Sequence, residues 1–312
     1  MKIFLAGATG AVGRPLVQRL VGAGHEVVGL TRRDDRARWL VEHGAAAVVG
    51  DAMDGEWLRD AVCEASPEVV IDQMTDLPQR IRMRGMGRFY RGQNPLRVRG
   101  SAALLDGARA AGARRIIAQS VAFIYAPGPG GPRTETAPTW ADAPEPFGNA
   151  IRVAVAHDQS VGNAADIEGV VLRYGVFYGP GTHYSPGNGQ YEDIRRRRQP
   201  IVGDGASVWS FVHVDDAAEA TVRAIEADAP PGVYNIVDDD PAPVADWLPA
   251  LAGALGAKPP RKVPVWLARL VAGPFSVMAM TQLQAASNVK AKQQLGWSPA
   301  IASWREGFRT AL

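Results

Sequence analysis

The sequence predicts an α/β fold, in which a doubly wound parallel sheet is followed by a smaller C-terminal α/β lobe. Three observations predict it. Short apolar stretches rich in strand-forming residues alternate with amphipathic helical stretches through the first half of the 312-residue chain. The turn after the first of these stretches is rich in glycine. After about residue 175 the alternation gives way to segments rich in proline and glycine, mixed with short strands and helices.

The individual elements follow from hydrophobic periodicity and from turn residues. Strands of the sheet are expected at 2–6, 25–30, 46–50, 68–72 and 114–120, separated by helices at 11–24, 36–44, 54–65 and 96–112. Strands separated by helices in this way form a parallel sheet covered on both faces. Later strands are expected at 210–214 and 232–237, with helices at 215–228, 244–256 and 288–295. We therefore divide the chain into a core, 1–175, and a lobe, 176–312, with chain crossings between them.

Composition excludes several classes of protein. Hydrophobic residues make up 46% of the chain and the formal net charge is only +2, so no global field favours nucleic acid or an anionic membrane. The basic run at 195–198 is isolated, and we interpret it as a solvated helix face or an anion contact. A single cysteine, Cys63, and the lack of a long apolar stretch predict a cytoplasmic protein without disulfides or membrane spans.

The glycine-rich turn predicts a dinucleotide site. Gly7, Gly10 and Gly13 lie between a predicted strand and a predicted helix. Glycines at this spacing allow a tight turn and a close approach of a pyrophosphate, which the helix N-terminus then binds through free N–H groups. The expected contacts in this segment are Gly7, Thr9, Gly10, Ala11, Val12 and Gly13.

The end of the second strand predicts which dinucleotide binds. An acidic residue there would bind the ribose hydroxyls of NAD, but this chain has Thr31 followed by Arg32 and Arg33. Guanidinium groups suit an additional phosphate, so we expect NADP(H), although exposed arginines without a ligand are the alternative. Asp51, with Ala52 after it, is expected to contact the adenine, and Asp51 could also cap a helix at 52–63.

These segments together resemble the short-chain dehydrogenase/reductase superfamily, in its extended epimerase/dehydratase branch. The resemblance rests on GATGAVG, GDAMD, VVID, AQSVAFIY, LRYGVFYGPG, SFVHVDDAAEA and LGWSP, which occur in family order along nearly the whole chain. It implies an enzyme with a Rossmann domain and a substrate lobe, active as a monomer or homodimer. The further cofactor contacts that it implies are Gln73, Met74, Ser120, Tyr174, Gly175 and Phe177.

The catalytic positions depart from the family pattern. Family members carry a serine after the fifth strand and a Tyr-x-x-x-Lys on the next helix, in which the tyrosine transfers the proton and the lysine lowers its pKa. Aligning AQSVAFIY and PFGNAI with that pattern places Val121, Phe147 and Ile151 at these positions, unless loop 126–146 shifts the register. Arg97 takes the place of the helix asparagine. Ser120, one residue early, is the remaining candidate for a catalytic hydroxyl.

The expected substrate pocket is aromatic. Nucleotide-sugar members of the family place an arginine just before the FVHVDD-like segment to hold the diphosphate, whereas this chain has Trp209 there. An indole stacks on a flat ring and cannot pair with a pyrophosphate. The residues expected to contact the substrate are Val121, Phe147, Tyr178, His183 and Trp209, and no metal site is expected.

Three functions remain open at this point. The first, which we favour, is an NADPH-dependent reductase acting on a ketone of an aromatic or polyketide-like molecule, whose own phenol supplies the proton. This resembles the atypical, simocyclinone-type ketoreductases of antibiotic biosynthesis. The second is the family activity, epimerisation or dehydration of a nucleotide sugar. The third is a non-catalytic NADP(H)-responsive binding protein.

Overall fold

Seven parallel strands form the central sheet of the computed structural model, which describes residues 1–78, 86–226 and 230–310. The strands are β1 (Lys2–Ala6), β2 (Glu26–Thr31), β3 (Ala46–Val49), β4 (Val69–Asp72), β5 (Arg115–Val121), β6 (Glu168–Tyr174) and β11 (Gly232–Ile236). Their order is β11-β6-β5-β4-β1-β2-β3. The order reverses at β1, between β2 and β4, and such a switch point opens a crevice at the carboxyl ends of the strands.

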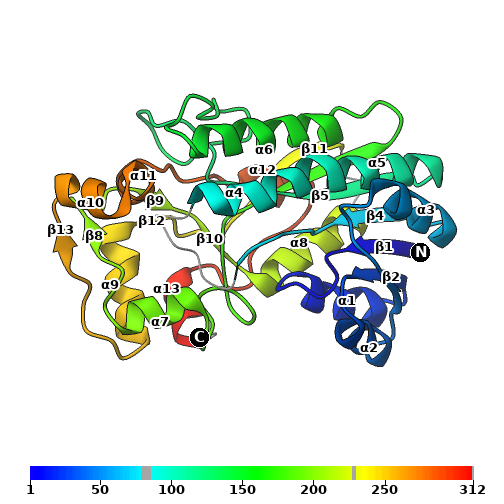
Figure 1. Cartoon of the computed structure of the whole chain (residues 1–312), viewed down its shortest axis with the longest axis horizontal. Coiled ribbons are helices and arrows are strands. Elements are labelled where there is room, and N and C mark those ends of the chain that lie inside the picture. Colours follow the sequence, from blue (N-terminus) through cyan, green and yellow to red (C-terminus); the bar gives the residue numbers. More distant parts are fainter. Residues whose placement is uncertain (79–85, 227–229, 311–312) are drawn as a thin grey trace.

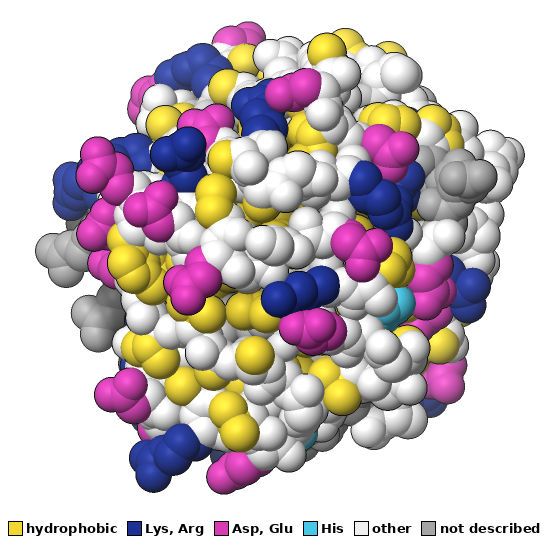
Figure 2. All heavy atoms as spheres, turned by 90° about the vertical axis from the view of Figure 1, so that its right-hand side faces the viewer, with side chains coloured by type: hydrophobic (Ala, Val, Ile, Leu, Met, Phe, Trp, Pro, Cys, Tyr) yellow, Lys and Arg dark blue, Asp and Glu magenta, His cyan; other side chains and the backbone are white. Residues whose placement is uncertain are grey.

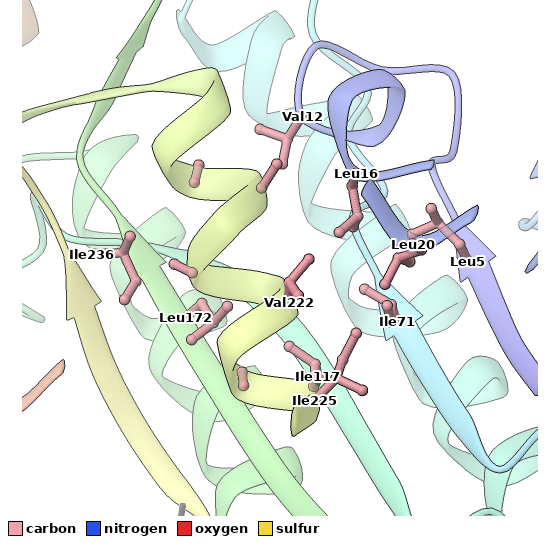
Figure 3. Packing of buried hydrophobic residues seen from close by; sticks show 14 of the residues in the cluster. Leu5, Val12, Leu16, Leu20, Ile71, Ile117, Leu172, Val222, Ile225 and Ile236 are labelled. Atoms are coloured by element: carbon pink, nitrogen blue, oxygen red, sulfur yellow. The ribbon is translucent and has the colours of Figure 1, made fainter. Parts of the chain in front are cut away.

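Helices cover both faces of this sheet (Figure 1). One face carries α1 (Gly13–Gly22), α2 (Asp34–Glu42), α8 (Val214–Glu226) and α12 (Val289–Gln294), and the other carries α3 (Gly55–Ala65), α5 (Ser101–Ala110) and α6 (Phe147–Gly162). The apolar positions of α1 that the 3.6-residue period predicted, Leu16 and Leu20, are fully buried. Figure 3 shows them packed with Ile71 and Ile117 of the sheet and with Val222 of α8.

The remaining elements form a smaller lobe at the side of the sheet (Figure 1). Its helices are α7 (Gly189–Arg195), α9 (Val244–Ala254), α10 (Val265–Ala272), α11 (Pro274–Thr281) and α13 (Trp304–Thr310). Its strands form three pairs: β7 (Val176–Tyr178) with β10 (Phe211–His213), β9 (Val208–Trp209) with β12 (Ala242–Pro243), and β8 (Ile201–Val202) with β13 (Lys262–Val263). A separate core of buried aromatic residues, including Trp247 and Trp304, holds this lobe together.

The predicted α/β class and the parallel sheet are confirmed. After residue 175 the chain returns to the sheet, where β11 pairs with β6 and α8 packs across one face. The helix expected at 96–112 differs, because a π-helical turn, η2 (Leu96–Gly100), joins α4 (Met86–Pro95) to α5. The boundary at residue 175 stays a prediction.

Several surface charges of the described chain are paired locally. In the run 195–198, Arg195 and Arg196 form ion pairs with Glu192, and Arg198 pairs with Asp193. Figure 2 shows cationic and anionic side chains interspersed on the face that it draws. No helix of the described segments is long and apolar enough to cross a membrane.

Candidate active site

A cavity of about 1440 Å³ lies at the carboxyl ends of the sheet strands and extends toward the smaller lobe. The glycine-rich turn after β1, the ends of β2, β4, β5 and β6, and helices α4, α6 and α11 all contribute to its lining. The cavity therefore occupies the crevice that the strand order predicts, and it is large enough for a dinucleotide together with a small substrate.

The glycine turn has the form that a pyrophosphate requires. Gly7 adopts a φ of +84°, and a Cβ there would come within 2.3 Å of the carbonyl oxygen of Gln73. A Cβ on Gly13 would come within 2.2 Å of the carbonyl oxygen of Gly7. Helix α1 begins at Gly13 with neither a side-chain cap nor an acidic residue in its first turn, so its N-terminal N–H groups remain available for an anion.

Two residues of this turn shape the site without lining it. Gly7, Thr9, Gly10 and Ala11 line the cavity, whereas Val12 and Gly13 do not. Val12 is buried in the core beneath α1, and Figure 3 shows it pointing toward α8. Gly13 allows α1 to pack closely against the turn.

The end of β2 places three arginines at the cavity. Thr31, Arg32 and Arg33 all line it, and so does Arg36 in the first turn of α2. Arg33 is bound bidentately by Asp35, at 2.8 and 2.7 Å. Arg32 lies 3.8 Å from Asp76, with both side chains exposed. Exposed ion pairs of this kind contribute little free energy. These guanidinium groups can therefore exchange a carboxylate for a phosphate.

Asp51 and Ala52 line the same end of the cavity. Asp51 does not cap the following helix, because Asp54 does so by accepting a bond from the backbone N–H of Trp57. The Asp51 carboxylate instead accepts from the backbone N–H of Met53, at 3.0 Å.

Fixed polar groups form the floor of the cavity. Gln73 donates to the Tyr174 hydroxyl at 2.9 Å, and this hydroxyl also lies 2.7 Å from Thr221 on α8. Burial raises the pKa of Tyr174 to about 12, although its hydrogen bonds to Thr221 and Gln73 lower it, so the phenol stays protonated at neutral pH. Met74, Gly175 and Phe177, which were predicted to contact the cofactor, complete this part of the lining.

One wall of the cavity is apolar. Val121 lies at the end of β5, Phe147 is the first residue of α6, and Ile151 follows it one turn later. All three line the cavity, and they belong to one hydrophobic cluster with Met278 and Phe275 of α11. The Phe147 ring lies edge-on to Phe275, with the ring centroids 5.5 Å apart. No lysine lies among the described residues that line the cavity.

The other expected substrate contacts divide into two groups. Trp209 lines the cavity, and its indole N–H donates to the carbonyl oxygen of Ala279 at 3.0 Å, which fixes the ring. His183 also lines the cavity and is half-buried. Tyr178 does not line it, because its side chain is fully buried in the core of the smaller lobe, against Phe211 and Phe308.

Buried polar residues lie behind the apolar wall. Ser120 lines the cavity, is 1% exposed and has no well-formed hydrogen bond from its hydroxyl to a described residue. It nonetheless lies close enough to Asp158 of α6 to affect that carboxylate. Burial raises the pKa of Asp158, but His157, Arg173 and Ser120 together bring it below its ordinary value. Arg173 donates to Asp158 at 2.7 Å, so this carboxylate is ionised and paired.

Arg97 also lines the cavity and is 9% exposed. It lies in the π-helical turn η2, where burial lowers its pKa and the charges of Asp158 of α6 and Asp72 at the end of β4 act against that effect. Among the described residues, no group of three or more His, Cys, Asp or Glu side chains could hold a metal ion.

The sequence did not identify several residues that line the cavity. Arg14 stacks on Trp39, 4.7 Å from the ring centroid, next to the arginines of β2 and α2. Tyr90 of α4 and Phe275 and Met278 of α11 complete the apolar wall. The run PFSVMAMTQL at 274–283 is apolar, but its period could not show that it packs against α6.

The fold and the site define the class of protein. Residues 3–237 match the NAD dependent epimerase/dehydratase family, and the chain belongs to this family. Over 308 residues, 99% of each chain, it is 42% identical to the 3-diazoavenalumate denitrifying reductase of a Streptomyces species.

Solved structures show the same fold. The UDP-glucose 4-epimerase of Thermotoga maritima with UDP-glucose is 23% identical, with a TM-score of 0.77 over 100% of this chain and 97% of that one. The UDP-glucose 4-epimerase of Thermus thermophilus in complex with NAD is 24% identical, with a TM-score of 0.76 over 100% and 97%. These enzymes share the fold, and their substrates do not carry over at this level of identity.

Proposed function

We propose that the protein is an NADPH-dependent reductase that replaces the diazo group of an aromatic acid by hydrogen and releases N₂. The observation that carries the proposal is the apolar wall. Val121, Phe147 and Ile151 line the cavity at the positions that align with the family's serine, tyrosine and lysine. A reaction in this cavity has to proceed without that proton-transfer set.

Reductive loss of a diazo group meets this condition. The 42% identical relative is a 3-diazoavenalumate denitrifying reductase, an enzyme whose name gives a diazo acid as its substrate. In net terms an arenediazonium and NADPH give the arene, N₂ and NADP⁺, and no proton is consumed. Ketone reduction instead leaves an alkoxide that must gain a proton. An apolar wall is therefore suited to the first reaction and poorly suited to the second.

The residues present fit a dinucleotide. A Cβ on Gly7 or Gly13 would fill the turn, and the N-terminus of α1 is uncapped. Arg32 and Arg36 line the cavity beyond β2, where Thr31 replaces a carboxylate, which favours the additional phosphate of NADP(H). A bound reduced nicotinamide supplies the hydride, while Gln73, held by Tyr174 and Thr221, forms a fixed floor.

The aromatic lining supports a flat substrate. Phe147, Phe275 and Trp209 present rings at or beside the cavity, and Trp209 is fixed by the Ala279 carbonyl. Rings of this kind stack on an arene and exclude water. Trp209, at the place of the diphosphate-binding arginine, argues against a nucleotide sugar.

Reduction of an aromatic ketone is the second candidate. One observation favours it: the buried hydroxyl of Ser120 lines the cavity and has no well-formed hydrogen bond to a described residue, so it could donate to an alkoxide. In this alternative the substrate's own phenol or Ser120 supplies the proton.

A turnover assay separates the candidates. NADPH oxidation is followed with aryl diazonium acids and with aromatic ketones whose neighbouring phenol is free or methylated. Turnover of the diazo acids with one N₂ per NADPH supports the proposal. Turnover restricted to ketones supports the second candidate, and Ser120→Ala would then test the donor. Tight NADPH binding without any turnover would point to the sensor or to the nucleotide-sugar activity.

A further inference from the structure

Arg97 is a buried cation that has no direct partner in the described part of the chain. Its side chain is 9% exposed, and Asp158, Asp72 and Tyr90 among the described residues act on its charge from a distance, without a side-chain hydrogen bond to it. Buried charges in proteins are normally paired or bind a ligand. An arginine carries five N–H donors and stays protonated, so the unused hydrogen-bonding capacity is large.

The carboxylates around Arg97 are already bound by other groups. Asp72 accepts from the Ser101 hydroxyl and from the backbone N–H of Met74. Asp158 accepts from Arg173 at 2.7 Å. Burial lowers the pKa of Arg97, and Asp158, Asp72 and Tyr90 act against that effect. The two carboxylates thus offset the cost of the cation without occupying its donors.

The open side of Arg97 faces the cavity. The residue lines it together with Tyr90, Ser120 and Ile151, so the cation lies on the substrate side, beside the apolar wall. The π-helical turn that carries it interrupts the regular helix between α4 and α5, and such turns occur frequently at functional sites.

We propose that Arg97 binds an anionic oxygen of the substrate, a carboxylate or a phenolate, and orients the arene in the cavity. The inference rests on the proposed aromatic acid substrate and names the group that anchors it. A guanidinium fork holds a carboxylate through two parallel hydrogen bonds and holds a phenolate through one or two. In this arrangement the cation selects acids over neutral arenes.

The test is a binding experiment that needs no turnover. The affinity of the NADP⁺-loaded protein is measured by calorimetry for cinnamate and its methyl ester, and for 4-nitrophenolate and 4-nitroanisole. The phenolate absorbance reports its ionisation in the site. The variants are Arg97→Met, Arg97→Gln and Arg97→Lys. Arg99→Met, two residues along the same turn and exposed, is the matched control.

We expect Arg97→Met and Arg97→Gln to weaken binding of at least one anion tenfold or more, while the neutral partner compounds and NADP⁺ bind as before. Arg97→Lys should retain part of the wild-type affinity for the anion, and Arg99→Met should leave all of the measured affinities unchanged. If the variants lose affinity for cinnamate alone, the group that Arg97 binds is a carboxylate. If they lose affinity for 4-nitrophenolate alone, it is a phenolate.

Three results would overturn the proposal. The first is a wild-type protein that binds neither anion. The others are Arg97 variants that lose affinity for anions and neutral compounds equally, or that lose affinity for NADP⁺ while anion affinity is unchanged. If Arg97→Met fails to fold, Arg97→Gln and Arg97→Lys carry the test. Selective anion binding without turnover of any diazo acid would support the role of Arg97 while refuting the proposed reaction.

Discussion

Replacing Gly13 by alanine should weaken dinucleotide binding by distorting the turn after β1. The added Cβ would come within 2.2 Å of the carbonyl oxygen of Gly7 and 2.6 Å of the carbonyl carbon of Ala8. Both are backbone atoms, so the turn or helix α1 has to move. Overpacking of this kind costs about 1–3 kcal/mol. If the cost falls on the bound state, affinity drops by about 5- to 150-fold, since 1.4 kcal/mol is roughly tenfold.

The assay is a titration of the protein with NADPH, followed by the nicotinamide fluorescence, with the melting temperature of the free protein measured in parallel. Gly22→Ala at the other end of α1 is the matched control, because a Cβ there has no atom within 4 Å. This control should bind NADPH normally and gain up to about 1 kcal/mol of stability from helix propensity. A Gly13→Ala protein with unchanged affinity and an unchanged melting temperature would refute the reasoning.

Three further predictions concern the wall, the cofactor and the smaller lobe. The triple variant Val121→Ser, Phe147→Tyr, Ile151→Lys should lower the free energy of unfolding in urea by about 2–4 kcal/mol, because it buries polar groups. It should not speed denitrification, and a tenfold faster reaction would mean that a proton donor limits the wild-type rate. Arg32→Ala should raise the KM for NADPH about tenfold and leave that for NADH unchanged; an equal effect on both would refute the NADP(H) assignment. Burial raises the pKa of Asp238 to about 8, so the folded state retains a proton that the unfolded chain loses above about pH 4, and stability falls as pH rises toward 8. The stability of the Asp238→Asn protein relative to the wild type should therefore increase between pH 5 and 8, by about 1–4 kcal/mol. If the melting temperatures of the two proteins change in parallel with pH, the prediction is contradicted.

Local periodicity was sufficient to predict the sheet. Strands such as 2–6 and 114–120 are continuous apolar runs, because a parallel sheet is buried on both faces, and each appears within a residue or two of its predicted bounds. The helix at 96–112 was only partly predicted. Nothing in its period indicates that 96–100 forms a π-helical turn, which orients Arg97 toward the cavity.

The predicted cofactor contacts rest on short-range patterns, because the turn after β1 and the end of β2 are each encoded within a few residues. The substrate half depends on packing between distant segments. The wall at Phe147 needs α11, more than 120 residues later, to supply Phe275. Tyr178 illustrates the limit: its neighbour Phe177 lines the cavity, whereas the Tyr178 side chain is buried in the core of the smaller lobe.

The most direct test of the proposed reaction follows the hydride. The protein is incubated with an aryl diazonium acid and NADPH deuterated at the transferable position of the nicotinamide, in ordinary water. The account predicts one deuterium in the arene at the carbon that carried the diazo group, with one N₂ released per NADPH oxidised. An arene that takes up hydrogen from water at this carbon, or a product that keeps both nitrogens, would contradict it.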